Sequence, residues 1–394
     1  MATKLSPLDY YFFRRQRYSI ELLLEFPRLI ARKKLAAAIE AQRSLFPAAF
    51  SRINVLSDFE IELEPSVEPL PILNFEMHSR PNTQDPDVVR GLIYPIENRE
   101  GQALVKFTLS NFEKQSYLGI SFSHMIGDGF SFFTFLQSIA ETCGDMGPMV
   151  AIQSDRSPLF VNNMTAKSLS EADFFSATGY LPMKSYASAQ AFDLETFELT
   201  HAELEKNRRE IRRASGAVVS NHDVMMAFIM QKYADRIPLG PNGELIIRCP
   251  VDFRKMMPQL GPIFFGNAVK DALAIFDPQS LARLAVAEIA QRIRRAIDDV
   301  NVVTVMQSMK TLNDFRMANG IGSFERVECP GLVVSNLSRM PFHILDFGSG
   351  PPSGVHPIQN PNFAVAMASP SGVSVSVKVP RSLCAVLEVS SQAC

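Results

Sequence analysis

The segment SFSHMIGDGFSFF, residues 121–133, places a histidine four positions before an aspartate, with one glycine on each side of the aspartate. Alternating apolar residues over 117–124 predict a strand, and His124 is the last residue on its more apolar face. Apolar residues recur at helical spacing after Gly129, which predicts a helix. The histidine therefore stands where a strand gives way to a helix, and the glycines allow the chain to turn sharply and leave space for a ligand.

Two interpretations of His124 follow from this segment alone. A neutral imidazole can accept a proton near neutral pH, so His124 is a candidate general base. Alternatively, His124 is a hydrogen-bonded structural histidine and Asp128 caps the following helix, which is the commoner meaning of so short a motif. An isolated HxxxD string does not decide between them.

Composition indicates a globular chain and argues against some classes of partner. The 394 residues are 46% hydrophobic and 20% charged, which suits a sizeable core in two or three domains or one large unit. The formal net charge is −2 and no basic stripe occurs, so we expect no nucleic acid partner. The chain lacks a run of about 18 apolar residues, so we expect no membrane span. Arg14, Arg15 and Arg17 interrupt the region that a signal peptide would need to keep apolar.

Several kinds of chemistry are excluded by absent motifs. The five cysteines are scattered and form no CxxC pair, so we expect reduced thiols in a cytoplasmic protein. The six histidines have no metal-binding spacing, and we expect no metal site. GxSxG, a phosphate-binding glycine loop and GxGxxG after a strand are also missing.

The remaining pattern mixes strands and helices in two halves. We predict helices at 35–46, 201–213, 221–234 and 280–300, the last capped by Ser280, and strands at 104–110, 245–251, 331–335, 363–368, 373–379 and 385–389. Residues 144–192 are weakly periodic and predict an irregular crossover. This order favours a mixed α/β or α+β class over a regular βαβ repeat. We predict halves at 1–165 and 193–394, joined by a linker at 166–192.

Two further segments contain candidate functional residues. In VDFR, residues 251–254, a buried Arg254 could pair with a carboxylate from elsewhere in the chain, or the segment could be an ordinary strand end. In residues 333–352, Ser335 and Asn336 precede a stretch rich in turn formers that includes Asp346, which predicts a defined loop.

Taken together and in order, these segments resemble the BAHD acyltransferases, which transfer acyl groups from coenzyme A thioesters to alcohols or amines. The resemblance is carried by LSPLD at 5–9, LAAAIEAQRSLFPAAFSRI at 35–53, SHMIGDG at 123–129, SNHDVMMAFIMQKYA at 220–234, VDFR at 251–254, FFGNAV at 264–269 and SNLSRMPFHILDFGSGPP at 335–352. The chain departs from the family pattern at Ser349, where DFGSG replaces DFGWG, and at Leu337, where many members have an aromatic residue. It is also shorter than most members.

The resemblance implies a fold of two pseudo-symmetric, chloramphenicol-acetyltransferase-like domains around a central solvent channel. His124 would lie at the middle of this channel and take a proton from the acceptor hydroxyl or amine, which then attacks the thioester without a covalent acyl-enzyme. The partners implied are acyl-CoA as co-substrate and a small-molecule acceptor, such as a secondary metabolite. No tightly bound cofactor is implied, and we expect a monomer.

The family motifs also assign roles to other residues. His124 and Asp128 form the catalytic motif, in which Asp128 turns away from the substrate and pairs with Arg254. Gly129, Asp346, Gly348 and Gly350 would support the structure, the last three in a loop near the CoA end. Ser220, Ser335 and Asn336 are candidate CoA contacts, because hydroxyls, amides and a helix N-terminus suit pantetheine and phosphate.

Two alternatives stay open at this stage. A protein with the same fold could take the acyl group from a carrier protein, as condensation domains do. It could also belong to a non-catalytic binding protein, although a decayed site would have no chemical reason to keep His124, Asp128 and Gly129 together.

Overall fold

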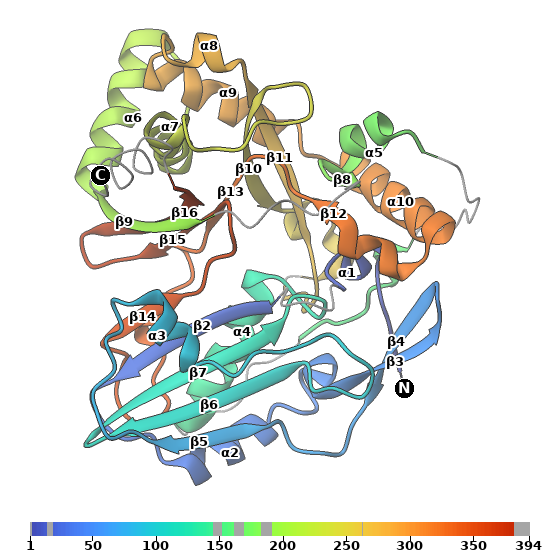
Figure 1. The fold of residues 1–394 in the computed structure, drawn as a ribbon, viewed down its shortest axis with the longest axis vertical. Coiled ribbons are helices and arrows are strands. Elements are labelled where there is room, and N and C mark those ends of the chain that lie inside the picture. Colours follow the sequence, from blue (N-terminus) through green and yellow to red (C-terminus); the bar gives the residue numbers. More distant parts are fainter. Residues whose placement is uncertain are drawn as a thin grey trace, which may run out of the picture.

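The structure is a computed structural model that describes residues 2–13, 19–144, 152–160, 169–182, 191–261 and 263–381. Its two large sheets lie one above the other in Figure 1, each with helices packed against it. The predicted mixed α/β class is confirmed. Pseudo-symmetry between the two halves stays a prediction.

The sheet of the N-terminal half has the strand order β14-β2-β7-β6-β5. Its strands are β2 (Ser19–Phe26), β5 (Ile72–Glu76), β6 (Val105–Phe112), β7 (Gln115–Ser123) and β14 (Gly354–Pro357). The helices of this half are α1 (Pro7–Tyr11), α2 (Arg32–Glu40), α3 (Pro86–Gly91) and α4 (Gly129–Cys143). A second, smaller sheet contains β1 (Thr3–Lys4), β3 (Ser51–Ser57) and β4 (Glu60–Pro65).

Strand β7 is buried on both faces, which explains its long apolar run. Leu118 belongs to the main core, whereas Tyr117 packs in a separate cluster with Val89 of α3. Gly119 is required here, because a Cβ at this position would lie 2.3 Å from the carbonyl oxygen of Leu92. The strand therefore holds its C-terminal end, and His124 after it, between packed layers.

The sheet of the C-terminal half has the order β11-β10-β13-β15-β16-β9. Its strands are β9 (Phe192–Thr200), β10 (Leu245–Asp252), β11 (Val269–Phe276), β13 (Leu332–Asn336), β15 (Phe363–Ala368) and β16 (Gly372–Pro380). The helices of this half are α6 (His201–Ser215), α7 (Asn221–Tyr233), α8 (Pro278–Leu281), α9 (Val286–Asp298) and α10 (Val302–Asn319). Strand β13 runs parallel to both of its neighbours, β10 and β15.

One strand crosses between the halves. β14 comes from the C-terminal half of the chain but pairs with β2, with Val355 opposite Leu24. The sheet of the first half is therefore completed by a segment that follows it by more than 200 positions in the sequence. Nothing in the sequence pattern predicted this exchange.

Other elements differ from the sequence predictions. The segment expected to be an irregular crossover contains α5 (Glu171–Thr178) and β8 (Leu181–Pro182), which pairs with β12 (Val327–Glu328). The helix predicted at 280–300 is divided into α8 and α9, and Ser280 lies inside α8, which Asp277 caps. The predicted strand at 385–389 lies outside the described residues.

The described part of the chain contains no helix long and apolar enough to cross a membrane. Cys143, Cys249 and Cys329 form no disulfide among the described residues, and Cys384 and Cys394 lie outside these residues.

Candidate active site

His124 lies directly after β7 and lines a cavity of about 150 Å³ between the two large sheets. Both halves of the chain contribute walls. The lining residues are Tyr11, Phe12, His124, Asp128, Gly129, Phe130, Tyr180, Pro250, Asp252, Arg254, Val269, Asp271, Cys329, Val333, Ser335, Asn336, Leu337, Met340 and Phe363. The motif histidine is thus part of a concave site between the two large sheets, and concave sites are where ligands commonly bind.

Asn267 sets the orientation and the tautomer of the His124 ring. Its amide nitrogen Nδ2 donates to Asp9 Oδ1 and to the backbone oxygen of His124, each over 2.8 Å. The amide oxygen Oδ1 therefore faces His124 Nδ1 at 3.2 Å and accepts from it. This arrangement places the proton on Nδ1, so Nε2 carries the lone pair. The Phe12 ring stacks on the imidazole with the ring centroids 3.7 Å apart.

Burial lowers the pKa of His124 below its ordinary value, because the protein interior disfavours the charged imidazolium. The negative charges of Asp128 and Asp9 and the contact with Asn267 oppose this shift without cancelling it. His124 is consequently neutral at pH 7, which is the protonation state that a general base requires.

Asp128 lies in a buried polar network with Arg254, Ser131 and Ala268. Its Oδ1 accepts from Arg254 Nη2 and from the backbone N–H of Ser131, each over 3.0 Å, and its Oδ2 accepts from the backbone N–H of Ala268 over 2.9 Å. Burial opposes ionisation of Asp128, but Arg254 and these hydrogen bonds outweigh it and hold the pKa of the carboxyl below its ordinary value. Asp128 is thus both the N-cap of α4 and the anion of a buried ion pair.

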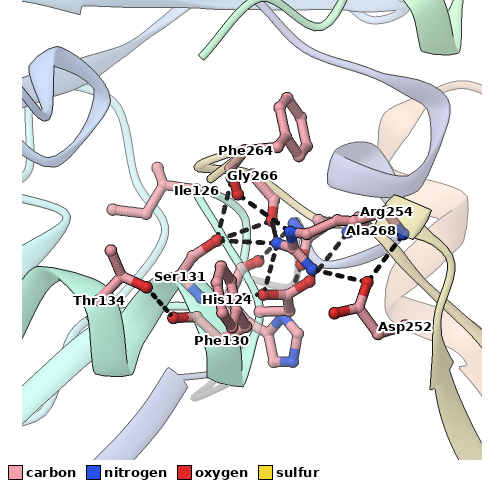
Figure 2. A network of polar contacts seen from close by, with 12 residues as sticks. His124, Ile126, Phe130, Ser131, Thr134, Asp252, Arg254, Phe264, Gly266 and Ala268 are labelled. Atoms are coloured by element: carbon pink, nitrogen blue, oxygen red, sulfur yellow. Dashed lines mark hydrogen bonds and ion pairs between the residues drawn. The ribbon is translucent and has the colours of Figure 1, made fainter. Parts of the chain in front are cut away.

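Arg254 connects three segments around Asp128. Its side chain also donates to the carbonyl oxygens of Phe264 and Gly266 and to Asp252 Oδ1. Arg254 Nη2 also donates to Ser131 Oγ at 3.2 Å, so in Figure 2 the Arg254 contacts join α4 to the 264–268 segment, and the His124 ring lies outside them. Only 4% of the Arg254 side chain is exposed, so its guanidinium fixes the turn that precedes α4 from a buried position.

Gly129 lies at the first turn of α4 against the opposite wall of the cavity. A Cβ there would lie 3.0 Å from Cδ2 of Leu337. A larger residue at position 129 would therefore push Leu337 or narrow the cavity beside His124.

Sequence reasoning assigned no role to Asp9 or Asn267, although both lie in quoted segments, LSPLD and FFGNAV. Asp9 is fully buried and binds Arg156 Nε at 2.8 Å through the oxygen that does not face Asn267. Arg156 in turn donates to the carbonyl oxygen of Ile126, inside the motif loop. A polar residue in a short segment was the available signal, but the partners that connect Asp9 to the site, Arg156 and Asn267, are more than 100 residues away.

The other predicted residues fall into two groups. Ser335 and Asn336 line the cavity, and Asn336 Nδ2 donates to His222 Nδ1 over 2.9 Å. Ser220 does not line it; its hydroxyl accepts from the backbone N–H of Asp223 as the N-cap of α7.

Asp346 also lies outside the cavity lining and organises the DFGSG loop. Its Oδ1 accepts from the backbone N–H groups of Gly348, Ser349 and Gly350 over 2.8–2.9 Å. Gly348 and Gly350 have positive φ values of 88° and 86°, which glycine adopts without strain. Phe347 is buried against Phe26 of β2, so the loop packs on the N-terminal half.

Comparison with known proteins identifies the family. A family model described as the Transferase family matches residues 76–387. The chain belongs to this family, the BAHD acyltransferases. Curated relatives include the hydroxycinnamoyl-CoA:5-hydroxyanthranilate N-hydroxycinnamoyltransferase HHT4 of Avena sativa, 26% identical over 60% of this chain and 54% of its own length. Hydroxycinnamoyltransferase 2 of Oryza sativa subsp. japonica is 24% identical over 65% of this chain and 60% of its own length. The chain thus spans little more than half of these relatives.

Solved structures with the same fold extend over almost the whole chain. TRI101 of F. sporotrichioides, in complex with coenzyme A and T-2, has a TM-score of 0.72 at 13% identity, covering 96% of this chain and 95% of that chain. Vinorine synthase has a TM-score of 0.68 at 17% identity, covering 98% and 91%. The first condensation domain of the CDA synthetase has a TM-score of 0.62 at 16% identity, covering 98% and 94%. At these identities the likeness shows the fold.

No group of three or more His, Cys, Asp or Glu side chains that could hold a metal ion occurs in the described ranges.

Proposed function

We propose that this BAHD family member transfers an acyl group from an acyl-CoA thioester to the hydroxyl or amine of a small-molecule acceptor. The observation that supports this most directly is a neutral, oriented His124 at the cavity between the two sheets, with Asn267 on Nδ1. Family membership and the acyl-CoA transferases among the relatives point to the same reaction.

In the proposed mechanism His124 Nε2 takes the proton of the acceptor hydroxyl or amine as its oxygen or nitrogen attacks the thioester carbonyl carbon. The tetrahedral intermediate then expels the CoA thiolate, which receives the proton from the His124 imidazolium. The C–S bond breaks, the new ester or amide bond forms, and the imidazole returns to its neutral state. Proton transfer by a positioned side chain contributes roughly 10²–10⁴ in rate.

The other site residues have supporting roles in this proposal. Asp128, Gly129 and Arg254 hold the loop that carries His124. Ser335 and Asn336 line the cavity and are our candidate contacts for the pantetheine arm. Ser220 is proposed to contact the donor through its hydroxyl at the start of α7, and Asp346 and the two loop glycines to shape the protein near the CoA end. The proposal further describes a cytoplasmic monomer without a tightly bound cofactor.

The test is a thiol-release assay with a panel of acyl-CoAs and crude acceptor extracts, comparing the wild type with His124→Ala. We expect acceptor-dependent CoA release by the wild type and a loss of roughly 10²-fold or more in the variant. Equal release by both proteins would refute the mechanism.

A second candidate is a donor other than CoA, because the condensation domain shares the fold. An acyl group presented on a carrier protein, with no activity on free acyl-CoA, would favour that function. A protein that binds acyl-CoA or acceptor but turns over neither donor would favour a non-catalytic binding role.

A further inference from the structure

A second interdomain cavity, of about 510 Å³, lies beside the His124 cavity and is lined by both halves of the chain. One wall is α3 and the exchanged strand β14, and the other is the face of β9 and β16 (Figure 1). Its lining residues with ionisable side chains are Arg90, His356 and Lys378, and it has no acidic lining residue among the described ones. It is called the basic cavity below.

The two cavities share one face of the C-terminal sheet. Val333, Phe363, Lys378 and Leu194 are register partners in successive strands, from β13 across β15 and β16 to β9. Cross-strand partners project from the same face of a sheet. Val333 and Phe363 line the His124 cavity, whereas Lys378 and Leu194 line the basic cavity. Because strands lie about 4.8 Å apart, Lys378 is the immediate neighbour of the His124 cavity wall.

The positive charges in this cavity are incompletely neutralised. Arg90 is exposed and also lines a neighbouring cavity with Glu21 and Asp87, and Lys378 Nζ donates to the carbonyl oxygen of Gln359 at 3.5 Å. Burial and the charge of Arg90 lower the pKa of Lys378, while Asp87 of α3 offsets part of this effect. His356 is engaged by Glu25 at 2.9 Å and so contributes little free charge. Arg90 and Lys378 line one cavity that has no carboxylate among its described lining residues, so an anion bound there would be stabilised by both cations.

Hydroxyl groups beside these cations suit the oxygens of an anion. Thr196 and Ser376 form a hydrogen-bonded pair at 2.9 Å on the cavity wall, next to Lys378 in the same strands. A hydroxyl can donate to a carboxylate while accepting from its neighbour.

We propose that this basic cavity binds a carboxylate group of the substrate that reacts at His124, which rests on the proposed function above. The carboxylate belongs to the acyl group or to the acceptor. The phosphates of CoA fit less well, because the whole pantetheine arm separates them from the thioester, whereas Lys378 is one strand from the wall of the reaction cavity.

Matched pairs of probes test this with the full-length protein by isothermal titration, without turnover. Glutaryl-CoA is compared with pentanoyl-CoA for the acyl source, and 3,4-dihydroxybenzoate with catechol for the acceptor source. The variants are Lys378→Gln, Arg90→Gln and the charge-conserving Lys378→Arg. Lys232→Gln, which removes a lysine stacked over Phe197 on another surface, is the control, and thermal unfolding verifies that each variant folds.

We expect the wild type to bind the carboxylate member of one pair roughly tenfold more tightly than its uncharged counterpart. One charge-assisted hydrogen bond contributes enough free energy for this difference. The preference should disappear in Lys378→Gln, weaken in Arg90→Gln, and persist in Lys378→Arg and Lys232→Gln. Equal affinities within both pairs, or a preference that survives both Gln variants, would overturn the proposal. So would a Lys378→Gln variant that loses only the preference for CoA over 3′-dephospho-CoA. Carboxylate binding without any acyl transfer would keep this site and refute the proposed function.

Discussion

Asn267→Ala tests whether the orientation of His124, and not only its presence, supports catalysis. The substitution removes the acceptor at 3.2 Å from His124 Nδ1 and the two donated bonds that hold the amide in place. Without it, the preference for the proton on Nδ1 weakens, and a larger fraction of the imidazole carries the proton on Nε2. The Nε2–H tautomer cannot accept a proton from the acceptor on that nitrogen.

The size of the effect follows from the restraints that remain. The Phe12 ring still stacks on the imidazole at 3.7 Å, and His124 keeps the hydrogen bond to its own backbone. We therefore expect the lower end of the range for general-base catalysis, a fall of about 10²-fold in kcat, or about 2.7 kcal/mol. KM should change little, because Asn267 is not a lining residue of the cavity.

Stability should fall as well, since Asp9 Oδ1 loses its donor in a fully buried site. An unsatisfied buried acceptor costs about 1–3 kcal/mol, although Arg156 still pairs with the other oxygen. Thermal unfolding measures this cost separately from kinetics. The matched control is Asn313→Ala, which removes a buried amide on α10 away from the site and should leave kcat unchanged.

The assay is steady-state CoA release, combined with nitrogen NMR of the imidazole to observe the tautomer. A folded Asn267→Ala protein with the wild-type kcat and an unchanged tautomer would refute the reasoning. A fall in kcat equal to that of Asn313→Ala would show a general loss of stability instead.

Three further predictions follow from the site and its supporting loops. Asp128→Ala should lower the free energy of unfolding by about 3–5 kcal/mol, because it leaves Arg254 buried without its anion; thermal unfolding and activity check this, and a soluble variant of full activity would contradict it. The acid limb of the kcat/KM profile should lie below about pH 6.5, since burial lowers the pKa of His124 and the neutral base persists to lower pH; a limb at or above that pH would be inconsistent with a desolvated base. Gly348→Ala should cost about 1–2 kcal/mol through its φ of +88° alone, because only Lys34 Cδ at 3.8 Å would meet the new Cβ; Gly322→Ala, which has open space and no positive φ, is the control, and equal unfolding temperatures for the two variants would oppose this account.

Local elements were predictable where the spacing of apolar residues or a capping residue marks them in the sequence. The alternation before His124 predicted β7, and Ser220 with Asp223 marked the start of α7. Helix α10 was not predicted, because its buried residues face several neighbours and leave no clear amphipathic stripe. The break between α8 and α9 was missed for a related reason: the helical pattern continues across a turn that tertiary packing imposes.

Some residues of the candidate site were also predictable from the sequence, and others were not. Arg254 as the partner of Asp128 was predicted from the family motifs, and the ion pair is present at 3.0 Å. Asn267 and Asp9 were not, because a hydrogen bond between residues 258 positions apart leaves no local pattern in one sequence. The basic cavity was not predicted for the same reason, since Arg90 and Lys378 come from opposite halves of the chain.

The sequence by itself determined the class of fold, the family motifs and the residue types needed for proton transfer. These depend on side-chain chemistry and on periods of two or three to four residues, which any chain displays locally. Only the tertiary structure decided which tautomer His124 adopts, which half supplies β14, and where Arg90 and Lys378 meet beside the His124 cavity. Each of these depends on distances between segments far apart in the chain, and folding sets those distances through the packing of the two sheets.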